Sequence, residues 1–284
     1  MFKKTFAVIA SLCLTIPAFA QQTLLYRISG NGLSQPSYLY GTVHLICERD
    51  FKMPAGLEKA VKTTQSLYLE VDMDDPNLIL AMAPLLQSNE PGYSLSDAFT
   101  PADFKKLDRF MSDSLGMDLV NFKKMKPMVL LSVILPKMLE CKTSVSYEQK
   151  LMELAKGAGK PVEGLEEIAD QIAVFDNMPD SLEARMIMDY INDIPKQKAI
   201  FSRLIANYKK GDVAALHQML GESPEFKGYE DVLVYNRNRN WIPVMDKAMR
   251  QNGALFAVGA MHLGGEKGVI SLLKKKGFKV EPVK

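Results

Sequence analysis

The sequence predicts an α/β protein with a central mixed sheet flanked by helices and a helix-rich middle region. Three observations predict this class. Short apolar runs typical of strands lie near both ends of the chain, most of residues 100–250 has helical patterning, and a strand-like run at 159–166 interrupts that region. Strands separated by helical segments indicate a sheet covered by helices. The two ends also resemble halves of an internal repeat, each closing with a strand and a Gly-x-x-His motif.

Residues 1–20 have the features of a secretory signal peptide. Lys3 and Lys4 precede an apolar stretch of roughly ten residues, and the segment ends in Ala-Phe-Ala, which suits signal peptidase. The stretch is shorter than the about 20 residues that cross a bilayer, although an N-terminal membrane anchor is the alternative. We therefore expect cleavage near Ala20, export to the periplasm or the medium, and no membrane span in the mature chain.

The mature chain, residues 21–284, is expected to form a single globular domain. Removing Lys3 and Lys4 from the 35 basic residues leaves 33, which equals the 33 acidic residues, so this chain is formally neutral. A neutral chain without a basic stripe gives no reason to expect a nucleic-acid partner. A chain of this length buries about three quarters of its unfolded surface, which is enough for a substantial core.

The N-terminal strands are predicted at 24–29 (LLYRIS) and 37–41 (SYLYG). The glycines and the proline of GNGLSQP between them mark a turn, so the two strands form a hairpin. A third strand is expected at 66–73 (SLYLEVDM), where the apolar run ends in acidic residues.

The helices are predicted from their capping residues. Thr100 followed by Pro101 is typical of a helix start. Asp180 with Glu183 resembles a capping box, which predicts one long helix through Tyr208. The remaining elements are expected as helices at 229–251 and 264–277, a strand and loop at 254–263, and an edge strand at 278–283.

Two copies of a Gly-x-x-His motif mark the candidate site. YLYGTVHL at 38–45 and FAVGAMHL at 256–263 each run from apolar residues into glycine, two spacers, histidine and leucine. Glycine permits a tight exit from the strand, so the imidazole can point back over the sheet edge. The alternative is that each imidazole satisfies backbone groups in a buried loop. His217, the third histidine, lacks this motif and is interpreted as structural or solvated.

Four polar side chains follow strands and are expected to converge on one crevice, because loops gather at the carboxyl ends of such strands. They are His44, Glu70, Glu166 and His262. Two imidazoles and a carboxylate that leave coordination positions open are able to hold a divalent ion, lower the pKa of its water and polarise a carbonyl. The alternatives are a plain salt bridge for Glu70 and a helix-start acid for Glu166.

Cys47 and Cys141 are the two cysteines that follow the predicted signal peptide. In an oxidising compartment they are expected to form a disulfide, with two free thiols as the alternative. Cys47 lies three residues after His44, so a bridge fixes the loop that carries this histidine. It also draws the helix start at Tyr147 and Glu148 toward that loop, which makes Glu148 a candidate for a supporting contact.

The chain resembles the TraB/GumN family, whose animal relatives are the TIKI proteins. The resemblance rests on YLYGTVHL, LYLEVDM, GKPVEGLEEIADQ, NRNRNW and FAVGAMHLGGEKGVISLLKKKGFKV, which follow in this order over essentially the whole mature chain. It implies a fold similar to the TIKI and erythromycin-esterase folds and a metal-dependent hydrolase, since TIKI proteins are described as metalloproteases that use manganese or cobalt.

The resemblance also implies roles for individual residues. His44, His262 and Glu70 fall on the positions of metal ligands, while Glu70, Glu166, Arg239 and Asn240 fall on positions expected in catalysis. Histidine and carboxylate ligands suit zinc, manganese and cobalt alike, so the residues do not distinguish among these metals.

Two functions follow from these residues. The first is an exported metal-dependent hydrolase, peptidase-like, whose substrate is a peptide or small molecule. The second is a binding protein that uses the same crevice to sequester a peptide or another small ligand without turnover. The histidine pair with Glu70 favours the enzyme. The binding protein stays an alternative, because the sequence lacks a His-Glu-x-x-His helix.

Overall fold

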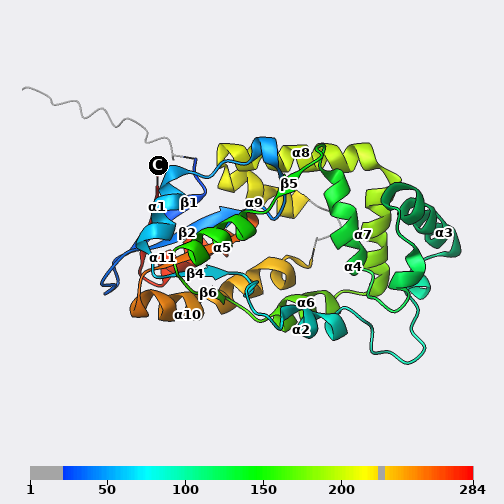
Figure 1. The fold of residues 1–284 in the computed structure, drawn as a ribbon, viewed down its shortest axis with the longest axis horizontal. Coiled ribbons are helices and arrows are strands. Elements are labelled where there is room, and N and C mark those ends of the chain that lie inside the picture. The colour runs from blue at the N-terminus through cyan, green and yellow to red at the C-terminus, as the bar shows by residue number, and fades with distance from the viewer. Residues whose placement is uncertain (1–21, 223–227, 284) are drawn as a thin grey trace, which may run out of the picture.

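A six-stranded mixed sheet forms the core of one lobe of the molecule (Figure 1). The structure is a computed structural model that describes residues 22–222 and 228–283, so the predicted signal peptide lies outside it. The strands lie in the order β6-β4-β7-β2-β1-β8. Their bounds are β1 Leu25–Ser29, β2 Ser37–Thr42, β4 Ser66–Leu69, β6 Val162–Gly164, β7 Ala254–Gly259 and β8 Lys279–Pro282. The predicted α/β class and mixed sheet are confirmed.

The strand directions place one set of loops at a single edge. The strands β6, β4, β7 and β2 run parallel, whereas β1 and β8 are antiparallel to their neighbours. The two motif strands, β2 and β7, are direct neighbours, with Thr42 opposite Gly259. Four parallel strands therefore end at the same edge, where ligands bind in open α/β sheets.

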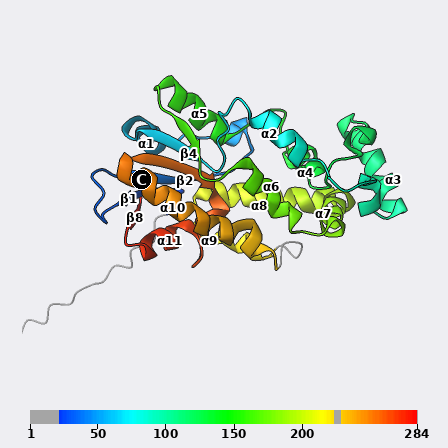
Figure 2. The ribbon, with the colours of Figure 1, turned by 90° about the horizontal axis from the view of Figure 1, so that it is seen from below.

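Helices cover both faces of this sheet (Figure 2). Helices α1 (Ala55–Thr63) and α5 (Tyr147–Gly157) pack on one face, and α10 (Asn236–Gln251) and α11 (Val269–Lys275) pack on the other. Leu39, Phe256 and Trp241 are fully buried between these layers. The near-continuous apolar β7 is typical of a strand that is covered on both faces.

The middle of the chain forms a helical lobe with a second core. Its side chains come from residues 95–138 and from α7, and they include Leu107, Leu130, Ile134, Ile187 and Ile191. The helices of the region between the strands are α2 (Leu78–Leu85), α3 (Pro101–Phe110), α4 (Val129–Ile134), α6 (Ile168–Asp176), α7 (Asp180–Asn192), α8 (Ile194–Lys210) and α9 (Val213–Glu222). In Figure 1, α8 runs along the upper side and α2 and α6 along the lower side, between the two lobes.

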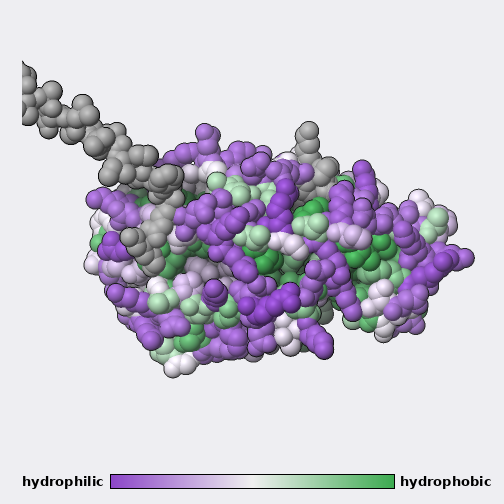
Figure 3. Space-filling view, turned by 90° about the horizontal axis from the view of Figure 1, so that it is seen from above, coloured by the Kyte–Doolittle hydropathy of each residue, from purple (hydrophilic) through white to green (hydrophobic). Residues whose placement is uncertain are grey.

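The surface of the molecule is mainly polar. On the side of α8, hydrophilic residues cover most of the face, and apolar residues show between them over the middle and the helical lobe (Figure 3). Among the described residues, none of the helices combines the length and the apolar character that crossing a membrane takes.

The long helix predicted from Asp180 through Tyr208 is wrong. The chain breaks at Asp193, whose side chain accepts the Lys196 N–H at 3.0 Å and starts α8, with Pro195 in its first turn. The predicted capping box is also absent, because the Glu183 carboxylate accepts the Met128 N–H at 3.0 Å instead. Glu183 thus makes a tertiary hydrogen bond in place of the local bond at the helix start that the sequence pattern predicts.

The predicted disulfide is confirmed. Cys47 and Cys141 are bonded, with 5.8 Å between their Cα atoms and a sequence separation of 94. The bridge lies beside a small two-stranded sheet of β3 (Ile46–Cys47) and β5 (Ser144–Val145). β3 follows the His44 loop and β5 precedes α5, so the bridge ties these two segments together.

Removing this bridge is expected to destabilise the protein. The double variant Cys47→Ser, Cys141→Ser should lower the free energy of unfolding by about 2 to 5 kcal/mol, because the unfolded chain is no longer restrained. Urea unfolding of both proteins measures the difference. Thiol titration of the unfolded, non-reduced wild type should find almost no free thiol, and two titratable thiols would contradict the bridge.

Candidate active site at the sheet edge

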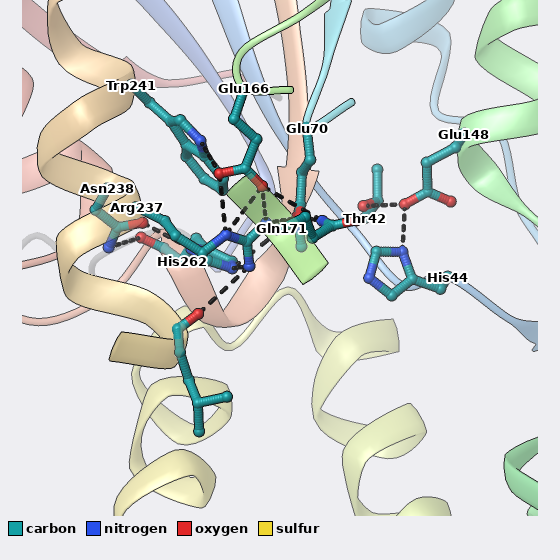
Figure 4. A network of polar contacts seen from close by, with 12 residues as sticks. Thr42, His44, Glu70, Glu148, Glu166, Gln171, Arg237, Asn238, Trp241 and His262 are labelled. Atoms are coloured by element: carbon teal, nitrogen blue, oxygen red, sulfur yellow. Dashed lines mark hydrogen bonds and ion pairs between the residues drawn. The ribbon is translucent and has the colours of Figure 1, made fainter. Parts of the chain in front are cut away.

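The structure brings the four predicted strand-exit residues to one edge of the sheet (Figure 4). Glu70 directly follows β4, and His262 ends the short helical turn after β7. His44 and Glu166 each lie two residues past a strand, β2 and β6 respectively. The parallel order of these strands is the reason why residues so distant in sequence share one edge.

The glycines of the two motifs let their segments pack closely. A Cβ atom on Gly41 would lie 2.6 Å from Leu263 Cδ1 and 3.1 Å from Ala260 Cα, both in the other motif segment. A Cβ atom on Gly259 would lie 3.2 Å from Glu70 Oε1. Each glycine therefore leaves space for a neighbour at the site.

A buried guanidinium joins two of the acids. Arg237 of α10 donates through Nη2 to Glu70 Oε2 at 2.6 Å, and through Nε to both oxygens of Glu166 at 3.0 and 3.1 Å. Trp241 lies one turn further along α10, where its ring faces the guanidinium at 5.0 Å and its Nε1 donates to Glu166 at 3.0 Å. The side chains of Glu70, Glu166 and Arg237 are 10%, 6% and 13% exposed, so this is a desolvated ion network.

Glu70 is held in its ionised form. Burial opposes the charge, but His262, Arg237 and the Gly259 N–H, which donates to Oε1 at 2.7 Å, bring the pKa of Glu70 down to about 2. Burial raises the pKa of Glu166 above its ordinary value despite the contacts of Arg237. Gln171 of α6 lies between the two acids and donates to Glu70 at 3.2 Å and to Glu166 at 3.4 Å.

His262 is fixed in one tautomer by its hydrogen bonds. Asn238 donates through its amide nitrogen to the carbonyls of His262 and Lys267, so its oxygen must accept the bond from His262 Nδ1, at 2.6 Å. The proton therefore lies on Nδ1, and the unprotonated Nε2 accepts a long hydrogen bond from Arg237. Nε2 lies 3.4 Å from Arg237 Nη1 and 4.0 Å from Glu70 Oε1. Burial lowers the pKa of His262 to about 4, which keeps the ring neutral.

His44 has the opposite environment. Its Nδ1 lies 2.9 Å from Glu148 Oε1, and its side chain is 72% exposed. The hydrogen bond to Glu148 raises the pKa of His44 to about 9, so the imidazole is charged at neutral pH. Thr42 and Ser146 donate to the same carboxylate at 2.6 and 2.8 Å and hold it in place. Nε2 of His44 makes no hydrogen bond within the described part of the chain and faces solvent.

Arg239 and Asn240 are not brought to this cluster. Both are exposed on α10, and Arg239 lies 3.8 Å from Asp231 on the outer side of the helix. Arg237 and Asn238 instead occupy the positions at the cluster that were predicted for Arg239 and Asn240. Trp241 is the signal that identifies the correct pair, because residues three and four positions before a buried residue share its helix face. Glu148 makes the contact to His44 that was expected from the disulfide, whereas nothing in the sequence indicated Gln171.

His217 lies under the loop that follows His262. A Cβ atom on Gly265 would lie 2.3 Å from His217 Nε2, and one on Gly264 would lie 2.8 Å from His217 Cβ. The two glycines thus permit close packing of α9 on this loop. This placement agrees with a structural role for His217.

The arrangement does not fit the metal that the family resemblance implies. Among the described residues, no group of three or more His, Cys, Asp or Glu side chains is placed to hold a metal ion. The reason is visible in the contacts: the carboxylate of Glu70 binds the guanidinium of Arg237, and the Nδ1 atoms of His44 and His262 bind Glu148 and Asn238. A positive side chain lies where the carboxylates would meet a cation.

Comparisons with known proteins find distant relatives that align with most of the chain. The chain is 23% identical over 315 residues to a Metalloprotease TIKI homolog of Amphimedon queenslandica, an alignment that covers 92% of this chain and 61% of that protein. It is 24% identical to the Uncharacterized protein YbaP of Escherichia coli strain K12, with coverage of 89% and 97%. Metalloprotease TIKI1 of Danio rerio is 21% identical, with coverage of 87% and 60%.

The chain thus spans about three fifths of the length of these TIKI relatives. No solved structure matches it. The TraB/PrgY/gumN family model matches residues 24–282, which include both Gly-x-x-His motifs and every strand of the sheet. The chain belongs to the TraB/PrgY/gumN family.

Proposed function

We propose that this protein is an exported hydrolase that cleaves amide bonds of peptides at the sheet edge, with His44 and His262 as its proton-transfer pair. One observation carries the proposal: each imidazole is fixed through Nδ1 by a buried partner, Glu148 or Asn238. A histidine held in this way presents Nε2 in a defined protonation state, which is the arrangement that general acid–base catalysis requires. The signal-like segment at 1–20 supports export.

The two histidines suit different halves of amide hydrolysis. Neutral His262 accepts a proton at Nε2 from the attacking water, whose oxygen forms the new bond to the carbonyl carbon. Charged His44 donates its Nε2 proton to the leaving nitrogen as the carbon–nitrogen bond breaks. The separated pKa values of the two rings support these assignments, because the environment keeps one imidazole as a base and the other as an acid.

The buried ion network positions the base. Arg237 lies between Glu70 and Glu166 and approaches His262 Nε2 at 3.4 Å, so it limits the rotation of all three side chains. Its positive charge also disfavours a second proton on His262. Charged His44 is the cation near which a developing oxyanion would be stabilised, because Arg237 is already paired with Glu70 and Glu166.

A peptide-library assay tests the proposal. Purified residues 21–284 are incubated with a mixed peptide library, with and without a chelator, and products are identified by mass spectrometry. The wild type is expected to cleave with the chelator present. His262→Gln should lower the rate by roughly 10²- to 10⁴-fold, and Arg239→Ala, an exposed change on α10, should leave it unchanged.

Two outcomes would overturn parts of this account. Saturable peptide binding without any product would favour the sequestering protein that the sequence also allows. Cleavage that stops with the chelator and returns with manganese or cobalt would favour the metal-dependent hydrolase that the names of the TIKI relatives suggest. Circular dichroism of each variant confirms that the fold is retained.

A further inference from the structure

Helix α2 carries the most exposed large apolar side chains of the described chain. Its sequence, LILAMAPL, is apolar on every side, and none of its residues is buried. Ile79 is 82% exposed and Leu80 is 77% exposed. A helix that is apolar all round is ordinarily buried, and exposed apolar patches mark interaction sites.

The contacts that hold α2 in place leave one side of the helix exposed. The helix packs against α6 on the lower side of the molecule (Figures 1 and 2). Its C-terminal end is tied to the helical lobe, since Leu86 accepts the Lys126 N–H at 3.0 Å and Gln87 pairs with Met125 in a β-bridge. Leu78, Met82 and Leu85 are half-buried, which leaves Ile79 and Leu80 directed outward.

Two connections link α2 to the candidate active site. Leu78 is eight residues after Glu70, so one short segment joins the strand exit to α2. On the other side, α6 carries Gln171, which donates to both Glu70 and Glu166. A chain that contacts the sheet edge and continues along α6 therefore reaches Ile79 and Leu80.

The segment between the site and α2 is acidic. It contains Asp72, Asp74 and Asp75, and of these Asp74 pairs with Lys156. Asp72 and Asp75 accept the backbone N–H groups of Asp74 and Asn77, and neither makes an ion pair with a described residue. These negative charges disfavour an anionic membrane as the partner and favour one with a positive group beside its apolar part.

We infer that α2 is a docking surface for the apolar segment of the peptide substrate, and that Asp72 and Asp75 bind a basic residue or free amino group beside that segment. This inference rests on the proposed function, because it assigns the substrate class of the same site. Apolar contacts with Ile79 and Leu80 would hold the segment, while the scissile bond lies at the sheet edge.

Binding is tested apart from turnover. The probe is a fluorescent peptide of about 12 residues with a central Leu/Val run and one lysine, and the comparison peptide has serines in that run. Fluorescence anisotropy with the His262→Gln protein gives Kd without cleavage. The apolar peptide is expected to bind at least about tenfold more tightly than the serine peptide, since burying one large apolar side chain is worth about that factor.

Variants locate the surface. The double change Ile79→Ser, Leu80→Ser should raise Kd for the apolar peptide by roughly tenfold or more. Val120→Ser is the matched control, because Val120 is 63% exposed but lies in the helical lobe, and it should leave Kd unchanged. Asp72→Asn with Asp75→Asn should weaken binding several-fold at low salt, and high salt should remove this difference.

Equal Kd values for the apolar and serine peptides, measured with the His262→Gln protein whose α2 is unchanged, would overturn the inference. So would an α2 variant that lowers binding to anionic vesicles or changes the oligomeric state while peptide Kd stays constant, since the surface would then serve a membrane or a second copy. Selective peptide binding at α2 without cleavage by the wild type would leave the docking surface in place and refute the hydrolase. Cleavage with the same KM for both peptides would leave the hydrolase in place and refute the docking surface.

Discussion

Replacing His44 with alanine is expected to lower kcat by roughly 10²- to 10⁴-fold, because the leaving nitrogen then lacks its proton donor. The melting temperature should stay close to that of the wild type, since the His44 side chain is 72% exposed and adds little to the core. Steady-state kinetics on a cleaved library peptide and thermal unfolding measure the two effects. A large fall in melting temperature with unchanged turnover would show that His44 is structural.

A change of Glu148 to glutamine separates proton donation from simple loss of the ring. Glu148 raises the pKa of His44 to about 9, so the wild type keeps charged His44, and hence activity, up to about that pH. Without the carboxylate the pKa should fall toward the ordinary value of about 6.5. Glu148→Gln should therefore keep most of its activity near pH 6 and lose roughly 30-fold near pH 8. The same alkaline limit in both proteins would contradict the role of His44 as an acid.

Replacing Arg237 with alanine is expected to lower the free energy of unfolding by about 3 to 5 kcal/mol at pH 7, because two buried carboxylates lose their cation. The sign of the pH dependence follows from Glu70. Its pKa is depressed in the folded state, so its contribution is present above about pH 4.3 and is lost as pH falls toward about 2. The variant loses the part of this contribution that Arg237 supplies, so the difference from the wild type should shrink in acid.

The same variant should gain a metal site. Without the guanidinium, Glu70, Glu166 and His262 supply two carboxylates and an imidazole, a donor set that suits manganese, cobalt or zinc. Added metal should therefore raise the melting temperature of Arg237→Ala and leave that of the wild type unchanged. Arg239→Ala, an exposed change two residues away, is the control and should show neither effect. Stabilisation of the wild type by one bound metal ion would contradict this prediction. It would show that Arg237 moves away from the carboxylates when the metal binds.

The sheet and the edge that carries the candidate site were predictable because they depend on local patterns. Apolar runs closed by glycine marked β2 and β7, and parallel strands then had to bring His44, Glu70 and His262 to one edge. The break between α7 and α8 was not predicted, because the prediction relied on the capping pattern at Asp180. Pro195 is the stronger signal, since proline is unfavourable inside a helix and marks the start of a new one.

The contacts of the site were less predictable, since they depend on the direction in which helix faces point. The motif NRNRNW offers two arginines, and only the packing of Trp241 decides that Arg237 faces the acids. The surroundings of the predicted metal ligands were hard to predict for a related reason. Spacing shows which donors share an edge, but it does not show that a guanidinium lies between them.

The measurement that most directly tests the proposed proton-transfer pair is an NMR titration of the three histidines, assigned with His44→Ala, His217→Ala and His262→Gln. Imidazole nitrogen shifts report charge and tautomer without any knowledge of the substrate. The structure predicts that His44 is charged at pH 7 and titrates near pH 9, and that His262 is neutral, carries its proton on Nδ1 and titrates near pH 4. Titration of both rings near pH 6.5, or a proton on Nε2 of His262, would contradict the account.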